Sequence, residues 1–393
     1  MSVPQTHDEA VTAAHRLAAE LAPGAIQRDR DGATVIPSEA LAALDASGLL
    51  AITVPAADGG PGLGPRTLAE VARVIAAADP SIAQVPQAHF LIVDILAVHG
   101  APEARKRLYG EILAGRRCGN ALAERGGKHA QDLRTTISGG LLNGVKYYTT
   151  GALTSAWIAV SALDERGRLV LAFVARDAAG VAVDTDWDVI GQRATISGTA
   201  TFTDVPVERG LRLDYAHAYE QPQQLGARAQ LYHAAIEVGI AGAALADARE
   251  YLRTRARPST EAVRAGASTA TDDPHVRHRY GRLASRVRAA EALLDAAART
   301  LEDVTLTPAD ADAAARGSLA VAAAKAFGSE VAVEAGSELF QMCGTSSAAA
   351  KHDLDRHWRN ARTHSVHDPL DWKYSHIAAY ELAGVLPPNH GQL

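Results

Sequence analysis

The segment Leu142-Asn143-Gly144-Val145-Lys146-Tyr147-Tyr148-Thr149-Thr150-Gly151 lies where the hydrophobic pattern of the chain changes from helical to alternating. Its β-branched and aromatic residues are typical of strands, and Asn143-Gly144 is a strong signal for a hairpin turn. Four more short β-rich runs, which turn residues separate, lie between Cys118 and Arg212. We therefore predict a small antiparallel β-sandwich or barrel of roughly five to seven strands in this part of the chain.

Apolar residues recur at helical spacing on both sides of this β region. Before Cys118 they predict several short helices, and after Gln221 they predict longer ones, which pack as a bundle. The expected long helices are Gln230–Arg257, Pro274–Val304, Pro308–Phe340 and Asp371–Ala383, with Pro258–Pro274 as a mobile loop. We therefore predict an N-terminal α-helical domain (1–117), a central β domain (118–220) and a C-terminal four-helix bundle domain (221–393).

The composition limits the possible functions. The 393 residues are 47% hydrophobic and 21% charged, which is typical of a globular protein with two or three domains. A net charge of −6 gives no reason to expect a nucleic-acid partner. Cys118 and Cys343 are the only cysteines, which excludes a disulfide scaffold and suits a reducing cytoplasm. The polar start and the charged residues between apolar stretches predict neither a leader peptide nor a membrane span.

Alanine-rich stretches cover much of the C-terminal region, as in AAIEVGIAGAALADA and AVAAAKAFGSEVAVEAG. Small side chains let helices approach one another closely, and such faces leave surface that a single copy does not cover. We therefore predict that the chain associates with copies of itself, as a homotetramer.

Three parts of the sequence resemble the acyl-CoA dehydrogenase superfamily. The segment 142–151 is similar to its LNGxKxWIT motif, and 191–197 with 202–207 is similar to its GxRxTxT…FxDVxV signature. Gln341–Gly344 followed by Asp355–Arg362 resembles its QxxGGxG…RDAR stretch. The resemblance covers nearly the whole chain and implies the same fold, in which a small β domain follows N-terminal helices and precedes a helical bundle.

The sequence departs from the dehydrogenase pattern at the catalytic base. Those enzymes carry IYEGT after RDAR, whereas this chain reads THSVHDPL, so that Asp368 takes the place of the Glu and Pro369 follows. A general base must come within about 3 Å of its proton, and Asp is one methylene shorter than Glu. The arginine segment that meets the adenine half of FAD is also replaced, by Arg253–Pro258, which favours FMN.

The run RNARTHSVHDP instead resembles the flavin-dependent monooxygenases on this fold, typified by dibenzothiophene monooxygenase and the sulfur-acquisition oxidoreductases. Gly119–Glu124, Thr254–Pro258 and Asp273-Pro274 resemble the same branch. The resemblance implies a two-component enzyme that takes reduced FMN from a separate flavin reductase, forms a C4a-hydroperoxyflavin with O2 and oxygenates a small organosulfur substrate. Two alternatives stay open: an FAD-dependent acyl-CoA dehydrogenase with Asp368 as base, and a catalytically silent scaffold subunit.

Histidine suits oxygen transfer because its ring can donate or return a proton near neutral pH. By position in the resembling motifs, His367 is the first catalytic candidate and His89 the second, with His364 and Asp368 in support. The alternatives are a core histidine for His89 and a helix cap before Pro369 for the others. The histidine spacing fits no metal-ligand pattern, so we predict no metal site.

The resemblance also implies which residues bind the flavin. A strand along the edge of the flavin contains Asn120, Leu122 and Ala123. A segment that supplies hydrogen-bond donors and an aromatic ring contains Tyr148, Thr149 and Thr150. A loop that reaches a neighbouring subunit's flavin contains Gly344, Thr345 and Ser346. Arg257 is the candidate for the phosphate, which needs a fixed positive charge, although loop arginines are usually solvated. Trp187 is the candidate for the substrate pocket, with a buried structural role as its alternative.

Overall fold

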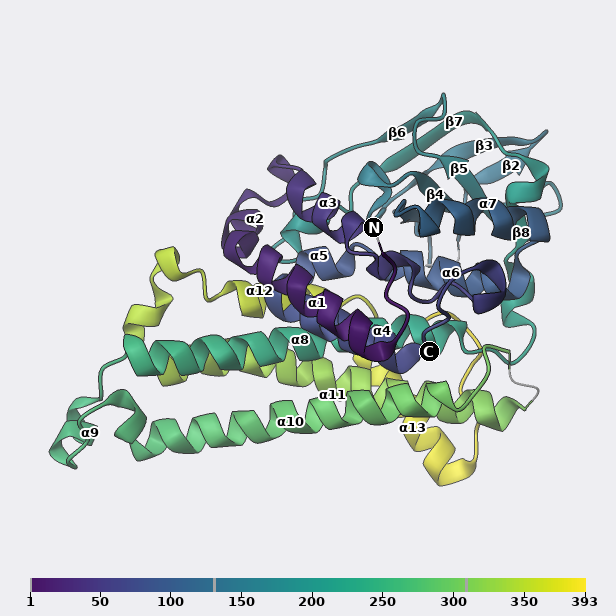
Figure 1. Ribbon diagram of the computed structural model, residues 1–393. Helices are drawn as coiled ribbons and strands as arrows, with labels where there is room; N and C mark the ends of the chain where they lie inside the picture. The colour runs from purple at the N-terminus through teal and green to yellow at the C-terminus, as the bar shows by residue number, and fades with distance from the viewer. Residues whose placement is uncertain (1, 130–131, 308–309) are drawn as a thin grey trace.

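The computed structural model describes residues 2–129, 132–307 and 310–393 (Figure 1). Its first part is helical, as predicted, because capping residues begin the helices that the apolar spacing defines. The Asp79 side chain, for example, accepts hydrogen bonds from the N–H groups of Ser81 and Ile82 at the start of α5. The helices are α1 (His7–Leu21), α2 (Ala25–Asp31), α3 (Ser38–Ala46), α4 (Pro65–Ala78), α5 (Pro80–Gln84), α6 (Gln87–His99) and α7 (Pro102–Leu113).

A single sheet follows these helices. Its strands are β1 (Cys118–Ala121), β2 (Thr136–Ser138), β3 (Leu141–Lys146), β4 (Trp157–Leu163), β5 (Leu169–Ala175), β6 (Val181–Val183), β7 (Ala200–Pro206) and β8 (Arg212–Asp214). Their order is β6-β7-β3-β2-β4-β5-β8, and β1 also pairs with β4. The sheet is mixed rather than purely antiparallel, since β1 and β2 both run parallel to β4. Long connections before β4 permit this direction, which a tight hairpin does not.

The hairpin predicted at Asn143-Gly144 is wrong. Both residues lie inside β3, where the register against β7 shifts, and the turn between β2 and β3 is formed by Gly139 and Gly140 at positive φ. Gly144 is needed because a Cβ there would lie 2.7 Å from the Cα of Thr135. The Asn-Gly pair therefore marks a β-bulge and not a turn.

The C-terminal region holds the long helices that the spacing predicted: α8 (Leu225–Thr254), α10 (Pro274–Glu302), α11 (Ala311–Cys343) and α13 (Leu370–Ala383), with α12 (Arg356–Ser365) before the last. The expected start of the third helix at Pro308 lies outside the described residues. The segment Pro258–Pro274 is more regular than the mobile loop we expected, because it contains α9 (Thr260–Arg264), which Ser259 caps, and a 3-10 turn at Ala270–Asp272, in which Ala270 is buried.

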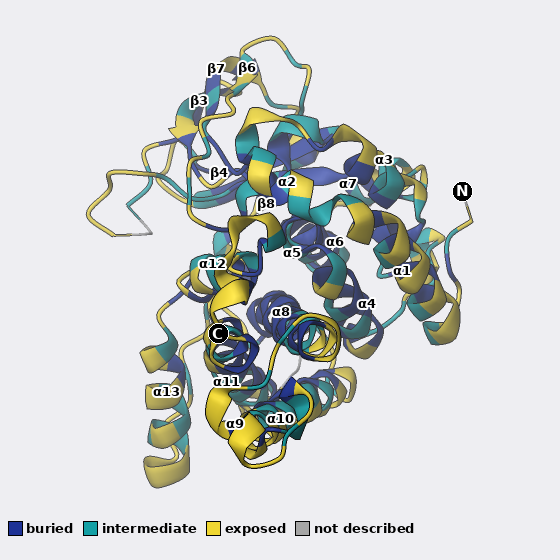
Figure 2. Ribbon diagram, turned by 90° about the vertical axis from the view of Figure 1, so that its left-hand side faces the viewer, coloured by how far each residue is buried: buried dark blue, intermediate teal, exposed yellow. Residues whose placement is uncertain are grey.

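The helices of the N-terminal region lie between the sheet and the long helices (Figures 1 and 2). One apolar core joins α1, α4 and α5 to α8, α10 and α11, through residues such as Leu17, Ile75 and Ile236. A second core packs α6 and α7 against one face of the sheet, and a third fills the other face. The N-terminal helices thus connect the β region to the bundle, and β4 is buried along nearly its whole length.

One stretch, Pro80–His99, is long and apolar enough to cross a membrane by composition alone. Asp94 is its only Asp, Glu, Lys or Arg residue, and it interrupts the stretch after residues 80–93, as we expected. In the fold this stretch forms the two helices α5 and α6, and 78% of its most apolar window is buried inside the protein. That is the environment of core helices.

Replacement of Gly144 by Ala tests the close approach of β3 to Thr135. The added methyl group has no free space, so we expect Gly144→Ala to lower the free energy of unfolding by about 2–3 kcal/mol. Gly110→Ala in α7 is the matched control, because its Cβ would meet nothing within 4 Å and alanine favours a helix. Urea unfolding measures both, and equal stability of the two variants would contradict the packing described here.

Candidate active site

His89 lies on α6 and is fully buried. Its Nδ1 accepts a hydrogen bond from the N–H of Cys118 (3.2 Å), so its Nε2 carries the proton and donates to the Leu50 carbonyl (2.9 Å). Burial lowers the pKa of His89 to about 4, which keeps the ring neutral at physiological pH. Both ring nitrogens are engaged with the backbone, so His89 links α6 to β1, and we withdraw it from the catalytic candidates.

His364, in the last turn of α12, belongs to a buried chain of polar side chains. Its Nδ1 lies 2.7 Å from Oε1 of Glu237, and its Nε2 lies 3.1 Å from Nδ1 of His233 and 3.2 Å from Oε1 of Gln84. Glu237, on α8, is fully buried, and its second carboxylate oxygen has no hydrogen-bond partner among the described residues. The chain thus ties α12 to α8 and α5 at the centre of the molecule.

His367 follows the end of α12 and lies beside Asp368. Its Nδ1 is 3.4 Å from Oδ1 of Asp368, and its ring packs against that of His233 at a centroid distance of 4.2 Å. The side chain of His367 is 44% exposed, whereas that of Asp368 is 2% exposed. The N–H of His367 donates to the His364 carbonyl (3.1 Å), and both rings contact His233. The structure therefore brings the two predicted histidines to one place.

Asp368 is held by two buried lysines. Lys325 of α11 lies 2.8 Å from Oδ1, and Lys373 of α13 lies 2.6 Å from Oδ2. Burial alone would raise the pKa of Asp368, but the contacts with His367 and the two lysines hold it far below its ordinary value. A carboxylate this firmly ionised and paired is a poor proton acceptor. Asp368 therefore orients its neighbours and is not placed to act as a general base.

Burial also acts on the histidine rings. It lowers the pKa of His233 well below the ordinary value, and the neighbouring His367 and Lys325 lower it further. Desolvation lowers the pKa of His367 as well, although its contact with Asp368 acts in the opposite direction. Both rings are therefore neutral near pH 7. A neutral His367 that donates Nδ1–H to Asp368 keeps Nε2 as an acceptor, and no hydrogen bond engages that atom among the described residues.

Sequence reasoning missed His233, Glu237, Lys325 and Lys373. A signal for the first two was present, because His233 and Glu237 are four residues apart in an otherwise apolar stretch and so share one face of α8. Lys325 likewise interrupts the alanine-rich run of α11. Buried charges must be paired, so each of these residues predicts a partner, but the sequence does not say which one.

The predicted flavin-edge and donor segments converge on the loop at 195–198. The N–H of Asn120 donates to the Thr150 carbonyl, and the N–H of Tyr147 donates to the Ala123 carbonyl. Leu122 accepts a hydrogen bond from the hydroxyl group of Ser161. β1 and the segment 147–151 therefore lie side by side, as the prediction requires.

The two threonines of this segment are engaged within the protein. Thr149 is fully buried, and its hydroxyl group donates to the Gly198 carbonyl (2.8 Å). The hydroxyl group of Thr150 shares a hydrogen bond with that of Ser197 (2.7 Å), which in turn contacts the hydroxyl group of Thr195. Thr150 thus belongs to a chain of hydroxyl groups, whereas the hydroxyl group of Thr149 holds two loops together.

Tyr148 and Trp187 lie together beside these segments, with their ring centroids 6.0 Å apart. Tyr148 is 54% exposed and has a positive φ of 58°, which turns its ring outward. Tyr147 contacts both rings, at centroid distances of 4.5 and 6.2 Å, and carries the Arg125 guanidinium over its face at 3.4 Å. The predicted substrate-pocket residue therefore neighbours the predicted aromatic residue of the flavin site.

The remaining predicted cofactor residues line one open recess of about 600 Å³. It contains Arg257 and the loop Gly344–Ser346, together with Arg255, Lys351 and His352. Tyr251 of α8 donates a hydrogen bond to Ser346 in its wall. His233 and Tyr251 are eighteen residues apart on α8, which corresponds to about 27 Å. Within one chain, this recess is therefore remote from His367.

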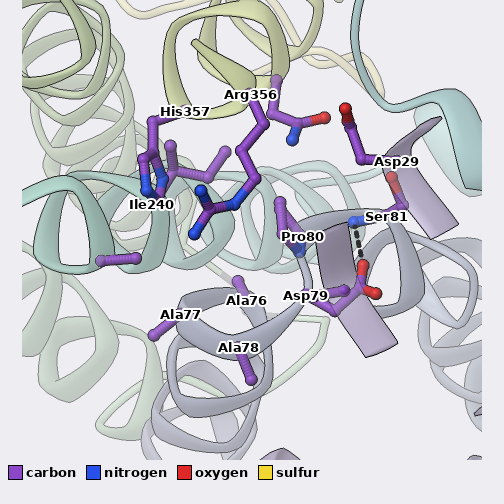
Figure 3. Close-up of a pocket in the computed structure, with 13 residues that line it drawn as sticks. Asp29, Ala76, Ala77, Ala78, Asp79, Pro80, Ser81, Ile240, Arg356 and His357 are labelled. Carbon is purple, nitrogen blue, oxygen red and sulfur yellow. Dashed lines mark hydrogen bonds between the residues drawn. The ribbon is translucent and has the colours of Figure 1, made fainter. Parts of the chain in front are cut away.

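A small cavity beside α12 is not the active site (Figure 3). Its volume is about 20 Å³, and Asp29, Asp79, Arg356 and His357 are among the residues that surround it. A space of this size holds one water molecule but no flavin or organic substrate. Arg356 and His357 are also engaged with Asp247, at 2.6 and 2.8 Å.

Comparison with known proteins agrees with this architecture. Residues 4–116 match the acyl-CoA dehydrogenase N-terminal domain, and residues 231–372 match the acyl-CoA dehydrogenase C-terminal domain. The fold and these two domains define a member of the acyl-CoA dehydrogenase superfamily.

More similar relatives identify the branch. A dibenzothiophene monooxygenase from Rhodococcus erythropolis is 33% identical over 97% of this chain and 94% of its own length. The probable FMNH2-dependent monooxygenase SfnC of Pseudomonas putida is 33% identical over 95% and 94%. FMN-bound TdsC from Paenibacillus sp. A11-2 superimposes with a TM-score of 0.91, at 29% identity over 98% and 100%. The chain therefore belongs to the flavin-dependent monooxygenases of this superfamily.

Removal of the Asp368 charge tests the buried ion cluster. Asp368→Asn leaves two buried lysines without their anion, so we expect a loss of about 3–5 kcal/mol in the free energy of unfolding at pH 7. Below about pH 4 the difference in the free energy of unfolding between Asp368→Asn and the wild type becomes smaller. There the unfolded wild type is stabilised because it takes up a proton at Asp368, whereas the folded wild type keeps this carboxylate ionised.

Asp371→Asn, an exposed substitution at the start of α13, is the control and should change the free energy of unfolding little. Unfolding by urea at pH 7 and at pH 3.5 measures all three proteins. Equal stability of Asp368→Asn and Asp371→Asn at pH 7 would show that the lysines do not depend on Asp368.

Proposed function

We propose that this chain is the oxygenase of a two-component flavin-dependent monooxygenase. It takes FMN that a separate reductase has reduced, uses O2, and oxygenates a small organosulfur compound. The observation that carries the proposal is the state of Asp368. Two lysines hold the only carboxylate at the dehydrogenase base position, while the neighbouring His367 stays accessible. The names of the relatives, dibenzothiophene monooxygenase and FMNH2-dependent monooxygenase, support the same function.

The residues present fit FMN. The segments around Asn120 and Thr150 offer backbone groups and hydroxyl groups for a flat polar ring edge, with Tyr148 beside them. The recess with Arg255 and Arg257 supplies cations and hydroxyl groups, which is the donor set that a phosphate requires. Reduced FMN supplies the electrons that activate O2. FAD stays the alternative cofactor, as in the dehydrogenases.

Within one chain the recess is remote from His367, so we propose that the recess and the segments around Thr150 belong to one site shared by two subunits of a homotetramer. Gly344–Ser346 and Arg257 of one copy would face the flavin that Tyr148 of another copy covers. The exposed apolar residues Trp372 and Leu382 on α13 give further surface for self-association.

The contacts indicate a separate role for each of these residues in the proposed reaction. Asp368 receives Nδ1–H of His367 and so fixes the orientation of the ring. Nε2 of His367 then holds or returns a proton at the reacting oxygen. Tyr148 and Trp187 present aromatic surface that excludes water and accepts an apolar sulfur compound. Because a flavin reductase and NADH belong to the cytoplasm, we place the enzyme there.

The direct test supplies the protein with a flavin reductase, FMN, NADH and O2 together with a panel of thiophenes, sulfinates, sulfones, amines and indole. We expect an oxygenated sulfur product that depends on all four components. Tight FAD and 2-enoyl-CoA formation from acyl-CoA would instead identify a dehydrogenase. No binding of reduced FMN and no change in peroxide yield would identify a scaffold subunit.

Loss of the His367 imidazole should uncouple the reaction. We expect His367→Ala to bind FMN normally but to turn at least nine-tenths of the consumed O2 into hydrogen peroxide. The reason is that the variant lacks the group that holds or returns a proton at the reacting oxygen. His15→Ala on the surface of α1 is the control. Product and peroxide are measured side by side. If His367→Ala still oxygenates at the wild-type yield, the role given to His367 is wrong.

A site shared by two subunits can be tested by complementation. Arg257→Gln should weaken FMN binding at least tenfold, since the phosphate loses a fixed cation. Neither Arg257→Gln nor His367→Ala should oxygenate alone. In mixed tetramers, however, a site can combine His367 of one copy with Arg257 of another, so co-expression should restore a part of the activity. No restoration in mixed tetramers that form normally would place both residues in one subunit's site.

A further inference from the structure

His367 adjoins a buried set of charged and titratable side chains that the proposed reaction does not itself explain. α8 supplies His233 and Glu237, α11 supplies Lys325, and α13 supplies Lys373. α12 and the segment after it supply His364 and Asp368. Gln84 of α5 is uncharged. The charged and titratable members other than His367 are each less than one-tenth exposed, so solvent screens them little.

The formal charges of this set balance. Lys325 and Lys373 provide two positive charges, and Asp368 and Glu237 provide two negative ones. The set is therefore neutral only while all three histidines are neutral. Addition of a proton to His367 would leave one uncompensated positive charge in a region where each unpaired charge is costly.

The geometry makes Lys325 the group in most direct competition with His367. Its Nζ lies 2.8 Å from Oδ1 of Asp368, the same oxygen that faces His367 Nδ1 at 3.4 Å. Lys373 binds the other oxygen. Glu237 acts from farther away, because His364 and His233 lie between it and His367. An anion that two imidazole rings separate from His367 exerts the weaker effect.

We propose that Lys325, Lys373 and Glu237 are positioning residues whose balanced charges keep His367 neutral and so set the pH range in which the enzyme couples O2 to product. The effect on the coupling of O2 to product rests on the proposed function, whereas the effect on the charge of His367 does not. Neutral His367 donates its Nδ1–H in a hydrogen bond to Asp368 and leaves Nε2 for the reaction. The lowered pKa of His367 agrees with this arrangement.

Charge variants should move the titration of His367 in opposite directions. Lys325→Met removes a cation and frees Oδ1, so we expect the pKa of His367 to rise by about one unit. Lys373→Met should raise it less. Glu237→Gln removes an anion but keeps an oxygen that accepts from His364 Nδ1–H, and we expect it to lower the pKa of His367 by a few tenths of a unit. Lys106→Met, on the exposed face of α7, is the control and should change nothing.

The readout needs no flavin. Diethyl pyrocarbonate acylates neutral imidazole, so its rate at His367 against pH gives the pKa of this one residue when peptides are resolved by mass spectrometry. The exposed His367 and the buried His364 are distinguished by fragmentation of the same peptide. Melting temperatures show whether each variant is folded, and the conservative Glu237→Gln keeps the test valid if a lysine variant is not.

Upward shifts in the lysine variants with a downward shift in Glu237→Gln support the proposal. A His367 pKa that stays within about 0.2 unit in all folded variants, or that moves in the same direction in each, overturns it. The pH profile of the product-to-peroxide ratio should shift in parallel. If His367 shifts as expected but no substrate is oxygenated, the charge balance holds and the proposed function fails.

Discussion

Asp368 connects four separate parts of the chain. Its carboxylate contacts Lys325 of α11, Lys373 of α13 and the imidazole of His367 after α12, and His367 in turn packs on His233 of α8. Charges buried this deeply persist only when they are paired, so the positions of these helices depend on one another. The same contacts that fix the helices also decide the chemistry. They prevent the Asp368 carboxylate from acting as an acid or base, and they leave the His367 imidazole accessible.

This arrangement separates the chain from the dehydrogenases whose fold it shares. Those enzymes need a free carboxylate to remove a proton from carbon. Here the shorter Asp368 ends within reach of two ammonium groups, and its pKa is held far below the ordinary value. A fold alone does not define a reaction, and one ion cluster can exclude the chemistry that is typical of its superfamily.

The fold was largely predictable from the sequence because long helices repeat their apolar spacing many times. α8, α10 and α13 begin and end within a few residues of the predicted bounds. The errors lie where a local signal competes with a tertiary contact. Asn143-Gly144 has the composition of a turn, but the close approach of Thr135 makes Gly144 part of a bulge. The site was predictable in part: motif position indicated His364, His367 and Asp368, whereas Lys325 and Lys373 come from separate helices that only the fold brings together.

The central claim is that the chain transfers one atom of O2 to sulfur. The most direct measurement is a single turnover in which chemically reduced FMN, the enzyme and an accepted organosulfur substrate react under 18O2, with the product analysed by mass spectrometry. We expect one 18O atom in the product for each turnover, and loss of that label to hydrogen peroxide in His367→Ala. Product oxygen derived from water, or electron transfer from acyl-CoA without O2, would contradict it.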